Sequence, residues 1–308
     1  MRIAIVGAGG VGGYYGAQLA KAGEDVTLIA RGAHLEAMRE HGLTIRTGDG
    51  PETIPVRATD DPASVGSVDL VIVAVKLWST GEAARSALPM LGPGTAVVSL
   101  QNGVDKDAEI AAIVGEQRVL GGVTYIGAQI AEPGVIEIGG ISARLLFGEF
   151  DATRSPRVEA FAAASQRAGL DFFVPPDIRR AIWEKFAFLT TMSGATALMR
   201  TGVGPIRSHP GSRRILVALL EEAAAVARAS GIALPDGYVA ERLAAIDTFP
   251  PGQMASMARD LLAGNRIEVP WLSGAVVRIG AERSVPTPTH AFVVDALSPY
   301  VDGPPTIH

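Results

Sequence analysis

Six residues near the start of the chain carry the clearest chemical signal. Gly7-Ala8-Gly9-Gly10-Val11-Gly12 follows the apolar segment Arg2–Val6 and precedes a helical pattern. In this setting the first glycine permits a tight turn, Gly9 lets the backbone approach a pyrophosphate, and Gly12 lets the helix pack on the strand. The free N–H groups and the positive dipole end of the helix then face the phosphates. We predict that this loop binds a dinucleotide, and the alternative is a structural turn in another kind of α/β protein.

The end of the next predicted strand indicates which dinucleotide. NAD-binding proteins usually place an acid there for the ribose 2′-hydroxyl, whereas this chain has Ile29-Ala30-Arg31-Gly32. A guanidinium offers paired donors and positive charge to a phosphate, and a carboxylate would repel it. Arg31 therefore predicts NADP as the cofactor, against the alternative of a solvated surface arginine.

Further polar side chains follow later strands of the predicted sheet. Lys76 follows Leu70–Val75, and Gln101-Asn102-Gly103 follows Ala96–Leu100. Ligands of open parallel sheets bind at the carboxyl ends of the strands, so these residues are expected at one edge. Lys185 stands in a strongly apolar stretch, where it either extends its ammonium to solvent or acts as a proton donor beside a cofactor.

Composition excludes several other classes of function. The 308-residue chain has no cysteine, and its formal charge is −5, so thiol chemistry is absent and no basic footprint for nucleic acid is present. No apolar run is long enough to span a bilayer, and we expect a cytoplasmic protein without membrane contact. No metal site is expected, because the five histidines lack ligand spacing: His34, His41, His209, His290 and His308.

The elements that must position these residues change character along the chain. The first part alternates short apolar segments with helical stretches, which predicts a doubly wound parallel sheet of the Rossmann type. The second part carries apolar residues at three- and four-residue spacing, which predicts an all-helical domain. Pro175-Pro176 separates the two patterns, so we predict an α/β domain over residues 1–176 and a helical domain over residues 177–308.

The expected elements are specific enough to be compared with a structure. Two glycine-rich segments, 44–57 and 134–147, are expected to add hairpins to the sheet, and Pro270 is expected to begin a helix in its first turn. The other expected strands are 2–6, 25–29, 70–75, 96–100 and 119–125, and the expected helices are 11–22, 33–41, 178–199, 213–230 and 270–282.

Taken together, these features resemble the ketopantoate reductase family over nearly the whole length of the chain. The glycine loop and Arg31 contribute to the resemblance. The other segments that carry it are Val75-Lys76, Gln101-Asn102-Gly103, Pro133-Gly134-Val135-Ile136, Trp183-Glu184-Lys185, and Ser256-Met257-Ala258-Arg259-Asp260 leading to Glu268.

The resemblance implies reduction of a 2-oxo acid, most readily 2-dehydropantoate (ketopantoate) to pantoate in pantothenate biosynthesis, with NADPH as hydride donor. It implies that Lys185 is the general acid and that Glu268 arranges the lysine or the cofactor. Asn102 would lie near both cofactor and substrate, and Ser256 would bind substrate. On the cofactor side, the positive charge of Lys76 would assist the cofactor, and Ala128 would contact the cofactor through its backbone. The resemblance also leads us to expect a homodimer.

Two positions depart from the pattern that the resemblance implies. Lys185, Leu189 and Ser193 recur at intervals of four and therefore share one helical face. The family usually has asparagines at the two later positions, which contact substrate hydroxyl groups. Ser193 keeps a hydroxyl for substrate, but Leu189 cannot form a side-chain hydrogen bond. Two alternatives therefore stay open: reduction of a less polar ketone or 2-oxo acid, and a non-catalytic NADP-binding sensor.

Overall fold

The computed structural model describes residues 1–305, without the side chains of residues 140–142, and divides into two compact units. Residues 1–102 and 106–181 form the first unit, and residues 103–105 together with the chain from Ile182 onward form the second. The strands are β1 (Arg2–Val6), β2 (Asp25–Ile29), β3 (Leu43–Thr47), β4 (Gly50–Ile54), β5 (Arg57–Thr59), β6 (Val68–Val73), β7 (Leu91–Ser99), β8 (Val119–Glu132), β9 (Val135–Gly148) and β10 (Asp171–Phe173). The helices of the first unit are α1 (Gly10–Lys21), α2 (Gly32–His41), α3 (Thr80–Ala87), α4 (Lys106–Val114) and α5 (Pro156–Arg167). The helices that follow are α6 (Ile178–Met199), α7 (Val203–Ser208), α8 (Pro210–Ala229), α9 (Tyr238–Thr248), α10 (Ser256–Leu262), α11 (Ser273–Glu282) and α12 (Pro288–Leu297).

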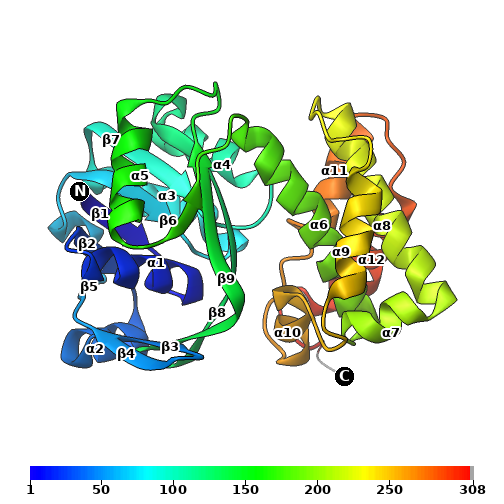
Figure 1. Cartoon of the computed structure of the whole chain (residues 1–308), viewed down its shortest axis with the longest axis horizontal. Helices are drawn as coiled ribbons and strands as arrows, with labels where there is room; N and C mark the ends of the chain where they lie inside the picture. Colours follow the sequence, from blue (N-terminus) through cyan, green and yellow to red (C-terminus); the bar gives the residue numbers. More distant parts are fainter. Residues whose placement is uncertain (306–308) are drawn as a thin grey trace. The chain divides into compact units, whose positions relative to one another are not determined.

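The first unit is built on one sheet whose strand order is β4-β3-β9-β8-β7-β6-β1-β2-β5, with β10 beside β9 (Figure 1). The segment from β5 to β8 is parallel throughout, and the order runs outward from β1 in both directions. This is the doubly wound arrangement, in which ligands bind at the carboxyl ends of the strands. The prediction of a Rossmann-type α/β domain followed by a helical domain is confirmed.

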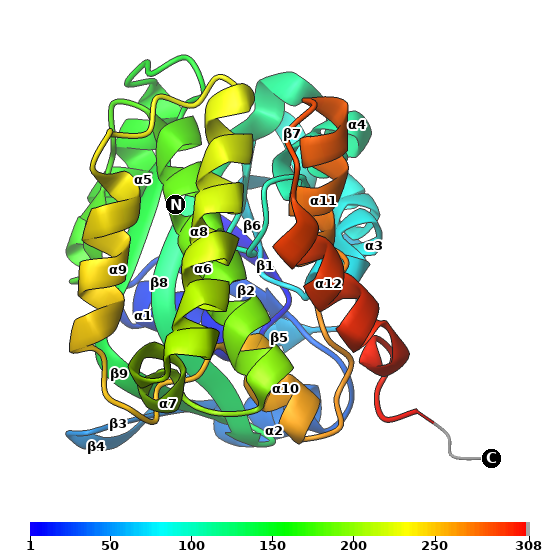
Figure 2. The same ribbon diagram turned by 90° about the vertical axis from the view of Figure 1, so that its right-hand side faces the viewer.

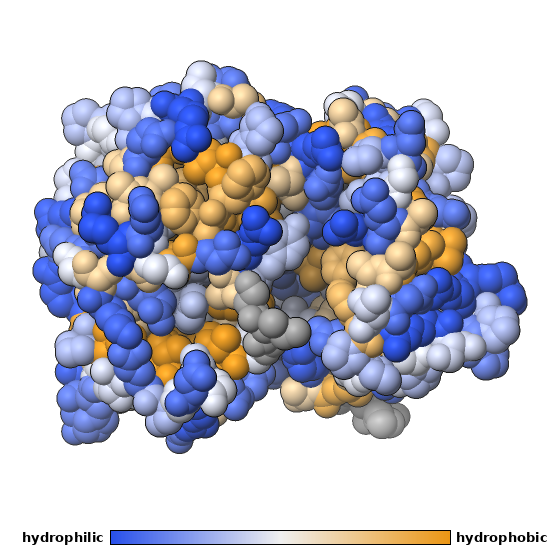
Figure 3. Space-filling model, viewed as in Figure 1, coloured by the Kyte–Doolittle hydropathy of each residue, from blue (hydrophilic) through white to orange (hydrophobic). Residues whose placement is uncertain are grey.

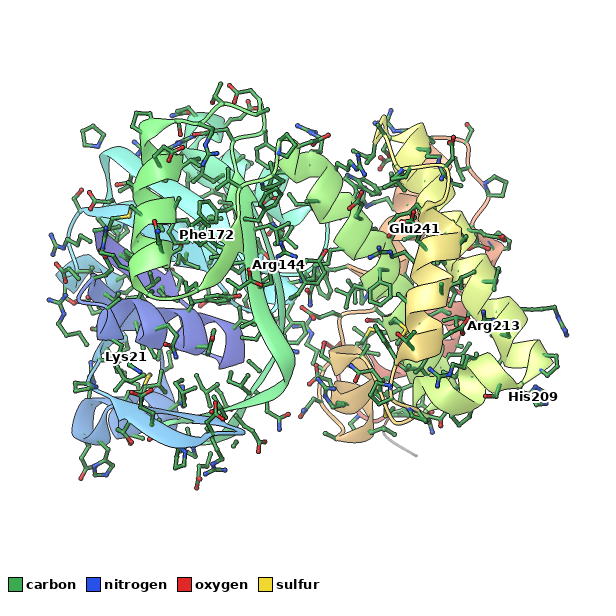
Figure 4. All side chains as sticks on the ribbon, in the orientation of Figure 1. Lys21, Arg144, Phe172, His209, Arg213 and Glu241 are labelled. Carbon is green, nitrogen blue, oxygen red and sulfur yellow. The ribbon has the colours of Figure 1, made fainter. Side chains whose placement is uncertain are left out.

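Both faces of the parallel strands are buried, because alternate side chains point to opposite faces. Ile3 and Ile5 of β1 belong to the apolar core under α1, α2 and α5, whereas Ala4 and Val6 belong to the core under α3 and α4. The aromatic ring of Phe172, labelled in Figure 4, stacks on Phe147 at 6.0 Å between ring centroids. The strands therefore need the continuous apolar composition seen in the sequence.

The predicted elements agree with the structure except at some ends. The strands β1 and β2 and the helix α6 begin and end as predicted, and the antiparallel pair β3–β4 confirms the hairpin expected in residues 44–57. The segment 134–147 instead forms one long strand, β9, which pairs with β8 to make a hairpin. The strand expected over residues 119–125 continues to Glu132, because β9 pairs with it along almost its whole length. The prediction that Pro270 begins a helix is wrong: it lies in a turn, and α11 begins at Ser273.

The second unit is organised around α8, which packs against α7, α9, α11 and α12 (Figure 2). At the start of α8, Arg213, labelled in Figure 4, forms an ion pair with Asp247 of α9. Further along α8, its Leu219 carbonyl lies 2.9 Å from the buried ring of His290 in α12. The same ring lies 3.2 Å from the Ser273 hydroxyl of α11. One neutral histidine thus joins three helices.

The surface in Figure 3 mixes hydrophilic side chains with smaller apolar areas. Among the helices of residues 1–305, none combines the length and the apolar composition that crossing a membrane would require.

The buried histidine should make stability depend on pH. Burial lowers the pKa of His290 from 6.5 to about 4, so the folded protein keeps the ring neutral where the unfolded chain already binds a proton. Stability should therefore fall by an amount on the order of 3 kcal/mol as the pH drops from about 6.5 to about 4. Across this pH range, the melting temperature of His290→Gln should depend less on pH than that of the native protein. The exposed His41→Gln serves as the control and should follow the native curve, and equal slopes in all three proteins would contradict the assignment.

Candidate functional site

The glycine loop joins β1 to α1 by close backbone contacts. Gly7 has φ +98°, a conformation that favours glycine, and the amides of Gly7 and Ala8 donate to the Ile29 carbonyl of β2. A Cβ on Gly12 would lie 2.1 Å from the Gly7 carbonyl oxygen, so only glycine lets the helix approach this closely. A Cβ on Gly10 would meet the Ala128 carbonyl of β8 at 2.5 Å. The loop is therefore fixed between three strands, with the first N–H groups of α1 directed out of its end.

A cavity of about 390 Å³ adjoins this loop within the first unit. A Cβ on Gly9 would have no protein atom within 4 Å, in contrast to Gly10 and Gly12, so this glycine borders open space. The lining combines the loop, the end of β2 and the start of α3: Val6, Gly7, Ala8, Gly9, Ile29, Ala30, Arg31, His34, Asp60, Pro62, Val75, Ser79, Glu82, Ala83, Ser86 and Ile130. An apolar wall beside helix N–H groups fits a dinucleotide.

Arg31 lies in the wall of this cavity, as its position after β2 predicts. It is the N-cap residue of α2, and its guanidinium lies 2.7 Å from the Glu82 carboxylate of α3. Both side chains are largely exposed, at 75% and 59%. Such an ion pair is weak in water and leaves the guanidinium accessible to a phosphate. Asp60, also in the wall, pairs with Arg39 and has a pKa below its usual value, because a backbone N–H and Arg39 stabilise its charge.

Lys76 and Asn102 follow β6 and β7, as predicted, and a buried amide joins their two loops. The Gln101 side chain accepts a hydrogen bond from the Ser99 hydroxyl at 2.9 Å and donates to the Thr80 hydroxyl at 2.8 Å. It also donates to the Lys76 carbonyl at 3.4 Å. Lys76 itself is exposed, and its ammonium lies 5.9 Å from the centre of the Trp78 ring.

A buried ion pair at the start of α4 joins the end of β7 to the first part of β8. The Lys106 ammonium bonds both carboxylate oxygens of Asp107, at 2.8 and 2.9 Å, and the carbonyls of Ser99 and Gly122. Burial raises the pKa of Asp107, although the ammonium opposes this effect. This pair was not expected from the sequence, where its signal is a lysine one residue before an acid at the start of a helix that ends in apolar residues.

The second unit carries Lys185 on α6. Lys185 and Leu189 are half-buried, and Ser193 is 1% exposed. Thr191 and Thr196 donate to carbonyls of the same helix, whereas the buried hydroxyls of Thr190 and Ser193 have no partner among the described residues. Positions 185, 189 and 193 of α6 therefore carry one ammonium, one apolar side chain and one hydroxyl that the helix backbone does not satisfy.

Glu268 and Ser256 belong to the same unit. Glu268 lies in the loop between α10 and α11 and is only 5% exposed, so it is not a solvated loop acid. Its carbonyl accepts the amides of Trp271 and Leu272, both at 3.1 Å, which fixes the turn before α11. Ser256 is the first residue of α10 and is half-buried. A buried carboxylate requires a polar or charged partner, which is consistent with a functional position.

The sequence analysis also missed His34, which lines the cavity from the first turn of α2. One ring nitrogen lies 2.9 Å from the Ala8 carbonyl and the other 3.0 Å from the Gly134 amide. The position of His34 three residues after Arg31 is the only signal that the sequence offers. Within residues 1–305, no group of three or more side chains is arranged to hold a metal ion.

Comparisons with known proteins identify the family of the chain. The family described as "Ketopantoate reductase PanE/ApbA" matches residues 3–152, and its C-terminal domain matches residues 177–301. The chain is 34% identical to a 2-dehydropantoate 2-reductase of Mesorhizobium japonicum, with 94% of each chain covered. It is 32% identical to the crystal structure of 2-dehydropantoate 2-reductase from Geobacter metallireducens, with a TM-score of 0.90 and coverage of 97% and 99%.

A D-mandelate dehydrogenase, solved with NADH and anilino(oxo)acetate, shares the fold at 22% identity and a TM-score of 0.89, over 97% of this chain and 98% of that one. The fold and the matches define an oxidoreductase with an NAD(P)H-binding fold. The chain belongs to the ketopantoate reductase family, in both its N-terminal and its C-terminal domain.

Two glycines of the loop should respond differently to alanine. Gly12→Ala should lower the melting temperature, because its Cβ would overlap the Gly7 carbonyl, a cost of roughly 2 kcal/mol. Gly9→Ala should melt like the native protein, since its φ of −69° suits alanine and no protein atom lies nearby. It should nevertheless bind the nicotinamide cofactor, titrated as NADPH and as NADH, at least about tenfold more weakly by fluorescence, because the methyl group would enter the space expected for the phosphates. Native affinity in Gly9→Ala would contradict the placement of the cofactor.

Proposed function

We propose that this protein reduces 2-dehydropantoate to pantoate in the cytoplasm, as an NADPH-dependent 2-oxo acid reductase of pantothenate biosynthesis. The observation that carries the proposal is the cavity between the glycine loop and Arg31, in a chain that matches both domains of the family. A phosphate-binding loop and a guanidinium in one cavity wall suit a cofactor with a pyrophosphate and a 2′-phosphate.

The first unit supplies the cofactor contacts of this proposal. The loop from Gly7 to Gly12 holds the pyrophosphate through its N–H groups, and Arg31 holds the 2′-phosphate. The Ala128 backbone, which contacts the loop at Gly10, and the charge of Lys76 support the same cofactor. When bound, NADPH supplies a hydride to the ketone carbon. Asn102 positions the reacting groups, and its loop is fixed by the hydrogen bonds of Gln101.

The second unit supplies the acid of the reaction. In the proposed mechanism the Lys185 ammonium donates a hydrogen bond to the ketone oxygen and stabilises the negative charge that develops there. It then transfers its proton, so that the ketone becomes a secondary alcohol. In this proposal the buried carboxylate of Glu268 orients the lysine or the cofactor, and the hydroxyls of Ser256 and Ser193 bind substrate.

Replacement of the proposed acid tests the function. Lys185→Ala should lower kcat for 2-dehydropantoate by about a hundredfold or more, because it removes a positioned proton donor. The dissociation constant of NADPH, measured by fluorescence, should stay at the native value. Lys21→Ala, which removes an exposed lysine paired with Glu52, is the matched control and should keep native turnover.

Three results would each decide against a part of this proposal. Native turnover in Lys185→Ala would exclude the lysine as the acid. Native protein that binds NADPH but turns over no 2-oxo acid would favour the NADP-binding sensor. Equal use of NADPH and NADH would contradict the role of Arg31.

Leu189 favours a second candidate, reduction of a less polar 2-oxo acid. Ketopantoate carries a terminal hydroxyl, and a leucine in place of asparagine offers that hydroxyl no hydrogen bond. Ser193 keeps a hydroxyl, but its side chain is shorter than that of asparagine.

A matched pair of substrates separates the two candidates. Under the second candidate, kcat/KM for 4-deoxyketopantoate should equal or exceed that for ketopantoate. Leu189→Asn should then shift the ratio toward ketopantoate by about tenfold, the usual effect of restoring one hydrogen bond. A strong native preference for ketopantoate in steady-state NADPH oxidation would exclude the second candidate, whichever way the variant behaves.

A further inference from the structure

His34 connects the glycine loop to a distant turn of the same unit. Its side chain is half-buried in the cavity wall, and both ring nitrogens are engaged. The Gly134 amide donates to Nδ1 at 3.0 Å, so Nδ1 carries no hydrogen and the ring proton lies on Nε2. Nε2 therefore donates to the Ala8 carbonyl at 2.9 Å. The ring is held in one tautomer by two backbone groups that are far apart in the sequence.

The contact with Ala8 determines how the loop presents its amides. The peptide group between Ala8 and Gly9 is planar and trans, so the direction of the Ala8 carbonyl also fixes the direction of the Gly9 N–H. The Ala8 amide donates to the Ile29 carbonyl at 3.3 Å, and the Gly9 carbonyl accepts the Gly13 amide at 2.7 Å. Along the backbone, the Ala8 carbonyl lies between these two hydrogen-bonded groups. The His34 side chain donates a hydrogen bond to it.

The other partner of His34 is itself rigidly placed. Gly134 has φ +76°, and a Cβ there would lie 2.9 Å from the Cβ of Ala37 on α2. Its carbonyl accepts the Thr44 amide of β3 at 2.9 Å. The turn before β9 is therefore packed on α2 and bonded to β3, which gives the Pro133-Gly134-Val135-Ile136 segment a structural purpose. It provides a fixed donor for the histidine.

We propose that His34 is a positioning residue for the nicotinamide cofactor. By holding the Ala8 carbonyl, it keeps the glycine loop in the arrangement that receives the pyrophosphate. The inference rests on the proposed function for the identity of the cofactor, but it concerns binding rather than turnover.

The two hydrogen bonds of His34 can be tested separately. His34→Gln keeps an N–H donor that reaches Ala8, whereas His34→Asn keeps only an acceptor near Gly134. Each variant loses one bond, so their cofactor-free melting temperatures should be similar. We expect His34→Ala and His34→Asn to bind NADPH about tenfold more weakly than the native protein, and His34→Gln within about threefold. The readout is the dissociation constant from fluorescence titration, with no substrate present.

Comparison of the two cofactors distinguishes positioning of the loop from direct phosphate contact. Because NADPH and NADH share the pyrophosphate, His34→Ala should weaken both by the same factor, whereas Arg31→Ala should weaken NADPH selectively. His41→Ala removes an exposed histidine at the far end of the same helix and should bind both cofactors with native affinity. Native affinity in His34→Ala would overturn the inference, and so would retention of binding by His34→Asn rather than by His34→Gln. Failure of the proposed reaction would instead appear as absent turnover by a native protein that binds cofactor.

Discussion

The absence of side chains at Gly10 and Gly12 is the constraint on which the first unit depends. Each of these glycines approaches backbone atoms to a distance that a Cβ could not tolerate: the Ala128 carbonyl of β8 at Gly10 and the Gly7 carbonyl of the preceding turn at Gly12. These two close approaches hold the N-terminus of α1 against β8 and against the loop that leaves β1. The cavity lies beside that loop.

Much of the fold could be predicted because its physical cause is local. Successive side chains of a strand point to opposite faces of the sheet, so a strand that is buried on both faces needs a largely apolar sequence. The sequence shows such apolar segments at β1 and β2, with the observed ends. Three- and four-residue spacing likewise predicts α6 with its observed bounds. The ends that differ depend on distant partners: β8 extends to Glu132 only because β9 pairs with it, and the turn at Pro270 is set by the carbonyl of Glu268.

The site shows the same division between local and distant causes. The place of Arg31 could be predicted because the fold itself specifies a position after the second strand, and Arg31 lies in the cavity wall. The contacts of His34 could not, since one partner lies on the Gly134 turn. The adjacent Lys106 and Asp107 were not singled out, because their burial depends on the end of β7 and on Gly122 of β8. A hydrogen bond between residues a hundred positions apart leaves no spacing pattern in the sequence. The roles of Lys185 and Glu268 came from family resemblance rather than from geometry.

The exposed pair of Arg31 and Glu82 bears on how such a protein can diverge in evolution. Neither side chain is part of the packed core, and their ion pair contributes little to stability. Asp60 lies in the same wall and is also exposed. Substitutions at these positions change the charge of the cavity wall without disturbing the sheet or α1. The glycine loop, packed backbone against backbone, has no such freedom. The fold thus joins an element that selection must preserve to a neighbouring cavity wall whose charge can change in single steps.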